Sequence, residues 1–231
     1  TTIVAGLIGE HIVIESEEPL PDESSTGRRK VPIDILPSAF YSIGAEFTQK
    51  ALVVCLTDLK GTIIQCVSSP YSDCLAREIT TRLIEGIQTV VAQSKISWEQ
   101  IVGVGIAVPG HINSDSDDLI TNRKTWSHFS PKELEKHIPL PVAYENNARC
   151  MALSQYLFRP AGSPDSFAFF HVGLGMFCAS VVDGDIFLGN NYMAGEIGHT
   201  IVNENGRRCE CGKYGCLQTY ASETWLLKNA R

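Results

Sequence analysis

Three of the chain's eight cysteines lie within eight residues, and this crowding constrains the local fold more than any other feature of the sequence. The segment reads Cys209-Glu-Cys-Gly-Lys-Tyr-Gly-Cys216, and His199 precedes it by nine intervening residues. A Cys-x-Cys pair, glycines that permit a tight turn and a third cysteine can bring three thiolates around one point. Structural zinc takes about four nitrogen or sulfur ligands in a tetrahedron. We therefore predict a closed, structural Zn2+ site formed by His199, Cys209, Cys211 and Cys216.

The other five cysteines are scattered through mostly apolar or strand-like surroundings. They are Cys55, Cys66, Cys74, Cys150 and Cys178. Cysteines in such surroundings usually act as small buried hydrophobic residues. The sequence opens without a secretory signal, which favours a reducing, cytoplasmic location in which disulfides are rare. We therefore expect these five to be buried thiols, and we expect the crowded cysteines to bind a metal rather than form disulfides.

The composition is that of an ordinary globular protein, with 44% hydrophobic and 19% charged residues. No apolar run approaches the ~18 residues that a membrane-spanning helix needs, so we expect no membrane insertion. The formal net charge of −7 argues against nucleic-acid binding by the whole surface. A small basic element could still contact DNA.

Residues 1–36 show the pattern of a helix, two strands and a basic turn. Apolar residues at helical spacing predict a helix over residues 1–9, and strands are predicted at 12–14 and 31–35. The turn between the strands includes Thr26-Gly-Arg-Arg-Lys30. Helix, strand, basic turn and strand in this order resemble the end of a winged helix-turn-helix. From charge alone, a surface hairpin with a solvated basic tip is the simpler interpretation.

From residue 39 onward the sequence alternates strand and helix patterns, which predicts an α/β fold. Residues 101–108 are almost continuously apolar, as in a buried parallel strand, and end at Pro109-Gly110. Open α/β sheets bind ligands at such carboxyl ends of their strands. A helix with one apolar face is predicted over residues 78–93. Further strands are predicted at residues 51–56, 62–67, 140–144, 167–172, 178–182 and 186–187, and a further helix at 148–157.

The segment Ala194-Gly-Glu-Ile-Gly-His199, together with the cysteine segment through Gln218, resembles the signature of the ROK family (repressors, open reading frames and sugar kinases). The similarity covers residues 39–231 and includes Val108-Pro-Gly110, Asn122, Glu145-Asn-Asn147 and the glycine-rich turn at Gly173. The resemblance implies an actin-like, hexokinase-like two-lobed fold of the α/β class that binds a sugar between its lobes. It places the first lobe at residues 37–158 and the second at 159–231, with the second continuing past the end of this chain.

The resemblance also implies a sugar site, carried over one residue at a time. Sugar hydroxyls both donate and accept hydrogen bonds, which suits amide and carboxylate side chains. In this interpretation His199 serves both the zinc ion and the sugar. The predicted sugar-binding residues are Gly110, Asn122, Asn146, Asn147, Glu196, His199 and Gln218.

Three departures from the kinases of the family argue against phosphoryl transfer. Those kinases take a proton from the sugar with the Asp of an Asn-Asp pair, and a neutral amide at Asn147 cannot act as that base. Their phosphate loop Asp-x-Gly-Gly-Thr is Glu46-Phe-Thr-Gln-Lys50 here, so side chains replace glycines that would approach phosphate. Their second loop, Gly-Thr-Gly-x-Gly-Gly, is Gly173-Leu-Gly-Met-Phe-Cys178, where we expect Phe177 to fill the phosphate space. We therefore expect no catalytic residues and no ATP.

Repressors of the family carry a winged helix-turn-helix before the sugar domain, so the resemblance favours that interpretation of residues 1–36, with the domain incomplete. Its predicted DNA contacts, made mostly to phosphate, are Thr1, Thr2, Arg28, Arg29 and Lys30. The predicted protein is a sugar-responsive repressor, a homodimer or homotetramer, that binds a monosaccharide or sugar phosphate and, in its full length, operator DNA. The alternatives are a sugar or amino-sugar kinase and a module controlled by a sugar-transporter subunit. The sequence does not identify the sugar.

Overall fold

The computed structural model describes residues 2–16, 31–71, 75–112, 118–121, 126, 128–190 and 192–230. The chain divides into two compact units: unit 1 is Thr1–Ile106 with Pro131–Ala143, and unit 2 is Ala107–Ser130 with Tyr144–Arg231. Two of the boundaries between the units fall inside strands, namely β6 (Ile101–Val108) and β9 (Val142–Asn146). The boundaries predicted at residues 36/37 and 158/159 do not coincide with these divisions and stay predictions.

Unit 1 is built on a five-stranded sheet in the order β5-β4-β3-β6-β9. Strands β3 (Tyr41–Phe47), β4 (Ala51–Asp58) and β5 (Ile63–Pro70) form an antiparallel meander. Along β4, buried Leu52, Val54 and Leu56 alternate with less buried residues, because successive side chains of a strand point to opposite faces. The strands predicted at 51–56, 62–67 and 101–108 are confirmed. Strand β3, between β4 and β6, is missing from the prediction.

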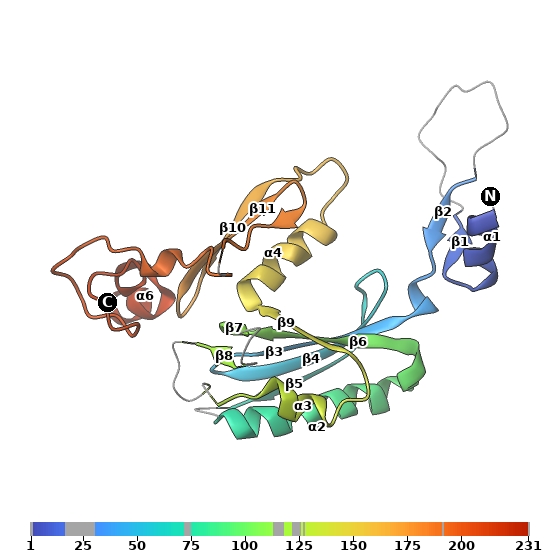
Figure 1. Ribbon diagram of the computed structural model, residues 1–231, viewed down its shortest axis with the longest axis horizontal. Helices are drawn as coiled ribbons and strands as arrows, with labels where there is room; N and C mark the ends of the chain where they lie inside the picture. Colours follow the sequence, from blue (N-terminus) through green and yellow to red (C-terminus); the bar gives the residue numbers. More distant parts are fainter. Residues whose placement is uncertain are drawn as a thin grey trace. The chain divides into compact units, whose positions relative to one another are not determined.

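Helix α2 (Ala76–Ser94) lies along one face of this sheet (Figure 1). Its buried residues recur at helical spacing, as the predicted helix at 78–93 requires; they include Ile79, Leu83, Ile87 and Val90. Gly86 lets the helix approach β4 closely, since a Cβ there would lie 2.8 Å from Cγ2 of Val54. The helix ends at Lys95, whose backbone is left-handed, with a φ of 62°.

Cys55 of β4 and Cys66 of β5 are paired residues of neighbouring strands, and the structure joins them in a disulfide. The alternation of β4 places Cys55 on the face opposite that of Val54 and Leu56, away from the buried side chains. The expectation of buried thiols is therefore wrong for this pair. Cys150 and Cys178 carry thiols that are only half-buried, and Cys74 lies outside the described residues.

The chain begins with helix α1 (Thr2–Gly9), followed by strands β1 (Val13–Glu15) and β2 (Ile33–Ile35). The two strands pair antiparallel, with Val13 opposite Ile35. The predicted helix and both predicted strands are thus present. Thr2 starts α1, whereas Thr1, Arg28, Arg29 and Lys30 lie outside the described residues. That these elements end a winged helix-turn-helix stays a prediction.

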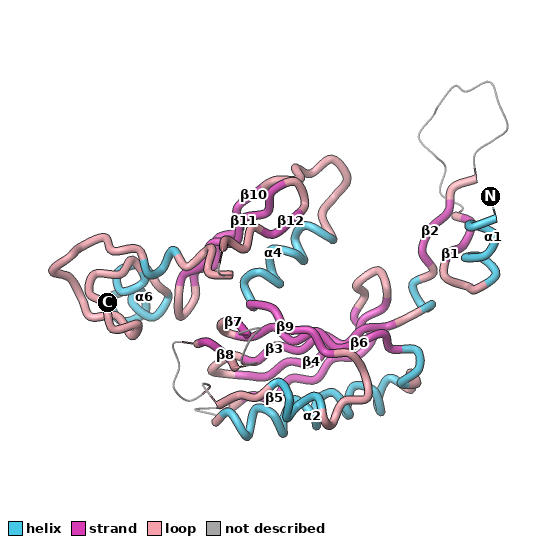
Figure 2. Tube along the Cα trace, in the orientation of Figure 1, coloured by secondary structure: helices cyan, strands magenta, loops and turns pink. Residues whose placement is uncertain are grey.

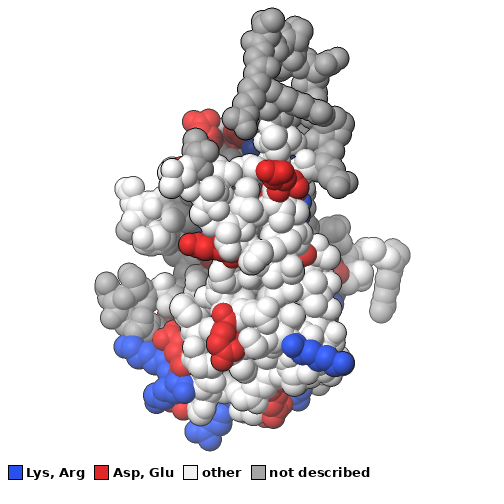
Figure 3. Space-filling model, turned by 90° about the vertical axis from the view of Figure 1, so that its right-hand side faces the viewer, with Lys and Arg blue, Asp and Glu red and all other residues white. Residues whose placement is uncertain are grey.

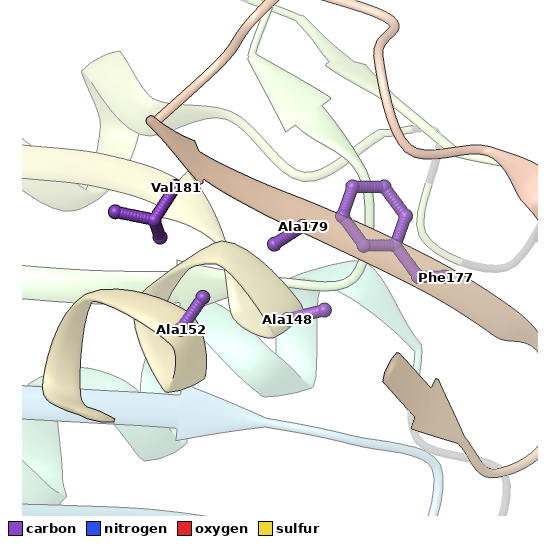
Figure 4. Packing of buried hydrophobic residues seen from close by; sticks show 5 residues of the cluster. All are labelled: Ala148, Ala152, Phe177, Ala179 and Val181. Atoms are coloured by element: carbon purple, nitrogen blue, oxygen red, sulfur yellow. The ribbon is translucent and has the colours of Figure 1, made fainter. Parts of the chain in front are cut away.

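Unit 2 contains a three-stranded antiparallel sheet and a helix that packs on it. These elements are β10 (Phe167–Val172), β11 (Met176–Val182), β12 (Asp185–Ile186) and α4 (Asn147–Leu157). Figure 4 shows Ala148 and Ala152 of α4 beside Phe177, Ala179 and Val181 of β11, the core of this unit. The ring of Phe177 is buried in this core, and that it also fills a phosphate space stays a prediction.

The other elements are short (Figure 2). They are η1 (Pro37–Ala39), η2 (Trp98–Gln100), β7 (His111–Ile112), β8 (Leu119–Ile120), α3 (Pro131–Glu135), η3 (Ile197–His199), α5 (Gln218–Ala221) and α6 (Glu223–Asn229). Within the described ranges, no helix combines the length and the apolar character needed to cross a bilayer. On the face shown in Figure 3, most of the basic side chains lie near the lower end of the view, whereas the acidic side chains are spread more widely.

Truncating the buried face of α2 should destabilise the protein. Leu83 is fully buried, so Leu83→Ala should lower the free energy of unfolding by about 2–5 kcal/mol through lost burial and the cavity left behind. Gln88→Ala, on the exposed face of the same helix, should change it by less than about 0.5 kcal/mol. Urea denaturation measures both, and equal losses would contradict the assigned packing.

Candidate functional site

Four side chains with metal-binding atoms converge in unit 2. The donor atoms of His199, Cys209, Cys211 and Cys216 all lie within 4.8 Å of one another. The sulfurs of Cys211 and Cys216 are 3.7 Å apart, and the Cys209 sulfur is 3.6 Å from Nδ1 of His199. A tetrahedral zinc ion separates two sulfur ligands by about 3.8 Å and a sulfur from a nitrogen by about 3.6 Å. The donor set and its spacing therefore fit one zinc ion.

Backbone hydrogen bonds bring these ligands together from separate parts of the chain. The N–H of Gly212 donates to the carbonyl of Cys209 at 3.0 Å and closes the turn that carries the first two cysteines. Ile201, two residues past His199, pairs antiparallel with Cys216. Local turns and this pairing, rather than long helices or strands, thus position the cluster.

The thiols of the cluster differ in their ionisation. Burial, together with the neighbouring thiols of Cys211 and Cys209, raises the pKa of Cys216 to about 12. Burial also acts to raise the pKa of Cys211, but hydrogen bonds from the backbone of Lys213 and from the other two thiols outweigh it, so that pKa lies below the ordinary thiol value. The Cys211 thiolate is therefore favoured by backbone hydrogen bonding.

Glu196 lies between two histidines. Its Oε1 is 3.2 Å from Nε2 of His111, and its Oε2 is 3.9 Å from Nε2 of His199. The metal-facing atom of His199 is the other ring nitrogen, Nδ1. One carboxylate, with 30% of its side chain exposed, therefore contacts His111 and faces the back of a candidate metal ligand.

The predicted sugar residues Gly110 and Asn146 are joined to each other. Asn146 caps α4: its Oδ1 accepts hydrogen bonds from the N–H groups of Ala148 and Arg149. Its Nδ2 donates to the carbonyl of Gly110 at 3.2 Å. Gly110 has a φ of 153°, and a Cβ there would lie 2.2 Å from the carbonyl oxygen of Ile120. Both residues therefore hold the loop after β6 against the start of α4.

Asn147 and Gln218 have amide side chains in different surroundings. Asn147 is half-buried in the first turn of α4, where its Oδ1 accepts from the N–H of Ala148 at 2.9 Å. Gln218 is buried, with its Nε2 3.5 Å from the Cys209 sulfur and 3.3 Å from Oε1 of Glu210. The Gln218 amide therefore contacts the cysteine cluster. That either residue binds sugar stays a prediction.

Arg149 is a buried charge that holds the segment before Glu196 in place. Its side chain is 2% exposed and donates to the backbone carbonyls of Tyr192 at 2.6 Å and Ala194 at 3.2 Å. Its other terminal nitrogen donates to the carboxylate of Glu145 at 3.3 Å. Helix α4 is thereby tied to the segment that leads into the Gly-Glu-Ile-Gly-His motif.

The remaining positions singled out from the sequence are Asn122 and residues 46–50. Asn122 lies outside the described residues. Residues 46–50 form the end of β3 and its turn into β4, in unit 1, where the N–H of Thr48 donates to the carbonyl of Ala51 at 2.9 Å.

His111 and Arg149 are site residues that the sequence reasoning missed. A polar residue directly after the Pro-Gly turn of a buried strand was a usable signal for His111. No local signal marks Arg149, because its burial depends on contacts with residues more than forty positions away.

A model of the ROK family matches residues 42–231, so this chain belongs to the ROK family. A solved structure described as a ROK family transcriptional regulator, homologous to the Escherichia coli MLC protein, covers 98% of this chain and 57% of its own, with a TM-score of 0.76 at 22% identity. The chain has the α/β, actin-like and hexokinase-like fold of that family, as the resemblance implied.

Two curated relatives illustrate the range of the family. The xylose repressor of Bacillus subtilis is 31% identical over 209 residues, which is 90% of this chain and 54% of that protein. The glucokinase of Halalkalibacterium halodurans is 33% identical over 155 residues, which is 66% of this chain and 47% of that enzyme. The chain spans about half the length of the curated relatives it matches.

Replacing Arg149 should cost far more stability than replacing a similar arginine at the surface. Arg149→Met leaves two carbonyls without their charged donor, so the free energy of unfolding should fall by about 2–4 kcal/mol. Arg159 also binds one carboxylate, Asp165, and one carbonyl, but is 23% exposed. Arg159→Met should cost less than about 1 kcal/mol. Equal losses in chemical denaturation would argue against Arg149 as an anchor.

Proposed function

We propose that this chain is part of a sugar-responsive transcriptional regulator whose kinase-derived domain binds a monosaccharide or sugar phosphate. The observation that carries this proposal is the neutral amide of Asn147 in the first turn of α4, where the kinases of the family place a carboxylate. An amide has no basic site that could take a proton from an attacking hydroxyl. The match to a xylose repressor over 90% of the chain supports the same conclusion.

The surroundings of Thr48 also support a regulator without ATP. Phosphate-binding loops offer free backbone N–H groups to the ligand. Here the Thr48 N–H is hydrogen-bonded within the turn, and Thr48 and Gln49 carry side chains where kinases have glycines. The turn is therefore built as an ordinary hairpin connection.

The sugar would contact polar groups of unit 2. Glu196 offers a partly exposed carboxylate, and Asn147 a half-buried amide. Asn122, Gly110, Asn146, His199 and Gln218 complete the proposed site, with the amides of Asn146 and Gln218 already engaged with the protein. Paired donors and acceptors of this kind match the hydroxyls of a sugar ring.

His199, Cys209, Cys211 and Cys216 are the proposed ligands of a structural zinc ion. The ion, when bound, would cross-link η3, which ends at His199, to the turn of Cys209 and Cys211. Glu196 faces Nε2 of His199, and the Gln218 amide contacts the Cys209 sulfur. Such contacts orient metal ligands.

In the whole protein, the N-terminal elements would complete a winged helix-turn-helix. Thr1, Thr2, Arg28, Arg29 and Lys30 would contact operator DNA, chiefly its phosphates. Sugar binding would change operator affinity by favouring one geometry of a homodimer or homotetramer, which requires different sugar affinities for the two states.

The purified protein should contain about one zinc ion per chain. Cys211→Ser removes one ligand and should lower both the zinc content and the melting temperature. Cys178→Ser, which changes a half-buried free thiol of the same unit, should leave the zinc content unchanged. Mass spectrometry of the metal and thermal unfolding measure these effects. Full zinc occupancy of the Cys211→Ser protein would contradict the assignment.

The full-length protein should bind operator DNA in a sugar-dependent manner. Gel-shift titration with neutral monosaccharides and their phosphates should identify one that changes operator affinity by about 5- to 150-fold. Absence of operator binding with and without every sugar would refute the regulator. A coupled assay with ATP tests the kinase alternative: sugar-dependent turnover that Asn147→Ala abolishes would establish it instead. Operator release only by a sugar-transporter subunit would identify a protein effector.

A further inference from the structure

We propose that His111 is a positioning residue that holds Glu196 in place and, through Glu196, orients the metal-binding ring of His199. This inference rests on the proposed zinc site. His111 belongs neither to the predicted sugar-binding residues nor to the predicted metal ligands.

The first step is the contact between His111 and Glu196. The His111 side chain is 9% exposed, and its Nε2 is the hydrogen-bond partner of Glu196 Oε1 at 3.2 Å. Glutamate loses considerable rotamer freedom when it is ordered. A buried ring on a paired strand can restrict that freedom. His111 lies on β7, which pairs with β8 through His111 and Ile120.

Glu196 also faces His199. The carboxylate oxygen that His111 does not contact, Oε2, lies 3.9 Å from Nε2 of His199. This separation is longer than a hydrogen bond. A fixed Glu196 carboxylate therefore restricts the orientation of the His199 ring without holding it by a hydrogen bond. The opposite ring nitrogen, Nδ1, faces the Cys209 sulfur at 3.6 Å. Carboxylates that accept a hydrogen bond from a metal-binding histidine set the tautomer and angle of its ring; at 3.9 Å Glu196 acts on Nε2 of His199 through its charge and position.

The third step is the support beneath His111. Gly110 directly precedes it, and the Gly110 carbonyl accepts a hydrogen bond from Nδ2 of Asn146, the cap of α4. On the other side, Arg149 of α4 binds the carbonyls of Tyr192 and Ala194 just before Glu196. Both residues of the His111–Glu196 pair are thus tied to the first turn of the same helix.

The arrangement has a consequence for ligand binding. A sugar that contacts Glu196 would act on a carboxylate already linked to the back of a metal ligand. Zinc affinity and sugar affinity should therefore respond together when His111 is replaced.

The test measures zinc affinity by competition with a chromophoric chelator, and the ligand field by the absorption of the cobalt(II)-substituted protein. His111→Leu should weaken zinc binding by up to roughly 10-fold and should alter the cobalt bands. Replacing a residue that contacts a metal ligand directly costs about 10- to 100-fold in metal affinity, and His111 acts one contact further away. His111→Gln, whose amide can still donate to Glu196, should restore most of both. His137→Leu is the matched control, because His137 faces Glu133 at 3.8 Å in unit 1 at an exposed position.

Unchanged zinc affinity and cobalt bands in folded His111→Leu would overturn the proposal. If His111→Leu fails to fold, His111→Gln and His111→Asn, whose side chain is shorter, provide the test. The proposal requires the Gln variant to bind zinc like the wild type and the Asn variant to lose zinc affinity. Equal zinc affinity of the two variants would overturn it. Wild-type protein without zinc would refute the metal site and this inference together. Zinc binding that depends on His111 without any sugar response would refute only the proposed regulator.

Discussion

Three sulfur atoms and one imidazole nitrogen within 4.8 Å of one another are the constraint on which the second half of unit 2 depends. Thiolates this close repel one another, and the attraction of each thiolate to a shared cation outweighs that repulsion. The surrounding segment is held by backbone hydrogen bonds, such as that from the N–H of Val202 to the carbonyl of Gly215, but it has little apolar packing, because Ile201, Val202 and Tyr214 are exposed. A bound zinc ion would supply the cross-link that a hydrophobic core supplies elsewhere.

The first turn of α4 is the second organising feature of this unit. Asn146 caps the helix and holds the Gly110 loop, while Arg149 holds the backbone just before Glu196. The helix also contributes Ala148 and Ala152 to the core with β11. A single helix end therefore positions the loop after β6, the motif with Glu196 and the sheet beneath them.

The proposed absence of ATP rests on chemical groups more than on the bulk of Phe177. The Phe177 ring packs in the core with α4, and its place in a phosphate space stays a prediction. The neutral Asn147 and the hydrogen-bonded turn at Thr48 carry that argument instead. Both concern chemical groups rather than filled space, and both are accessible to assay.

The sequence by itself determined features that depend on local spacing. Helix α2 follows from apolar residues at helical spacing, and β4, β5, β6, β10 and β11 from short apolar runs and turns. The three crowded cysteines and His199 could be recognised as a group, since their spacing is nearly all that a zinc site needs. The family resemblance added the positions of the sugar site, which remain a proposal.

Only the tertiary structure decided which side chains meet across long separations. The packing of α4 and the strands brings Glu196 to His111. It also brings the carbonyls of Tyr192 and Ala194 to Arg149. The pairing of Cys55 with Cys66 depends on strand register, and the burial of Phe177 on which face of β11 receives α4. Local sequence specifies the period of a strand or helix, but the face that becomes buried is chosen by the element that packs against it.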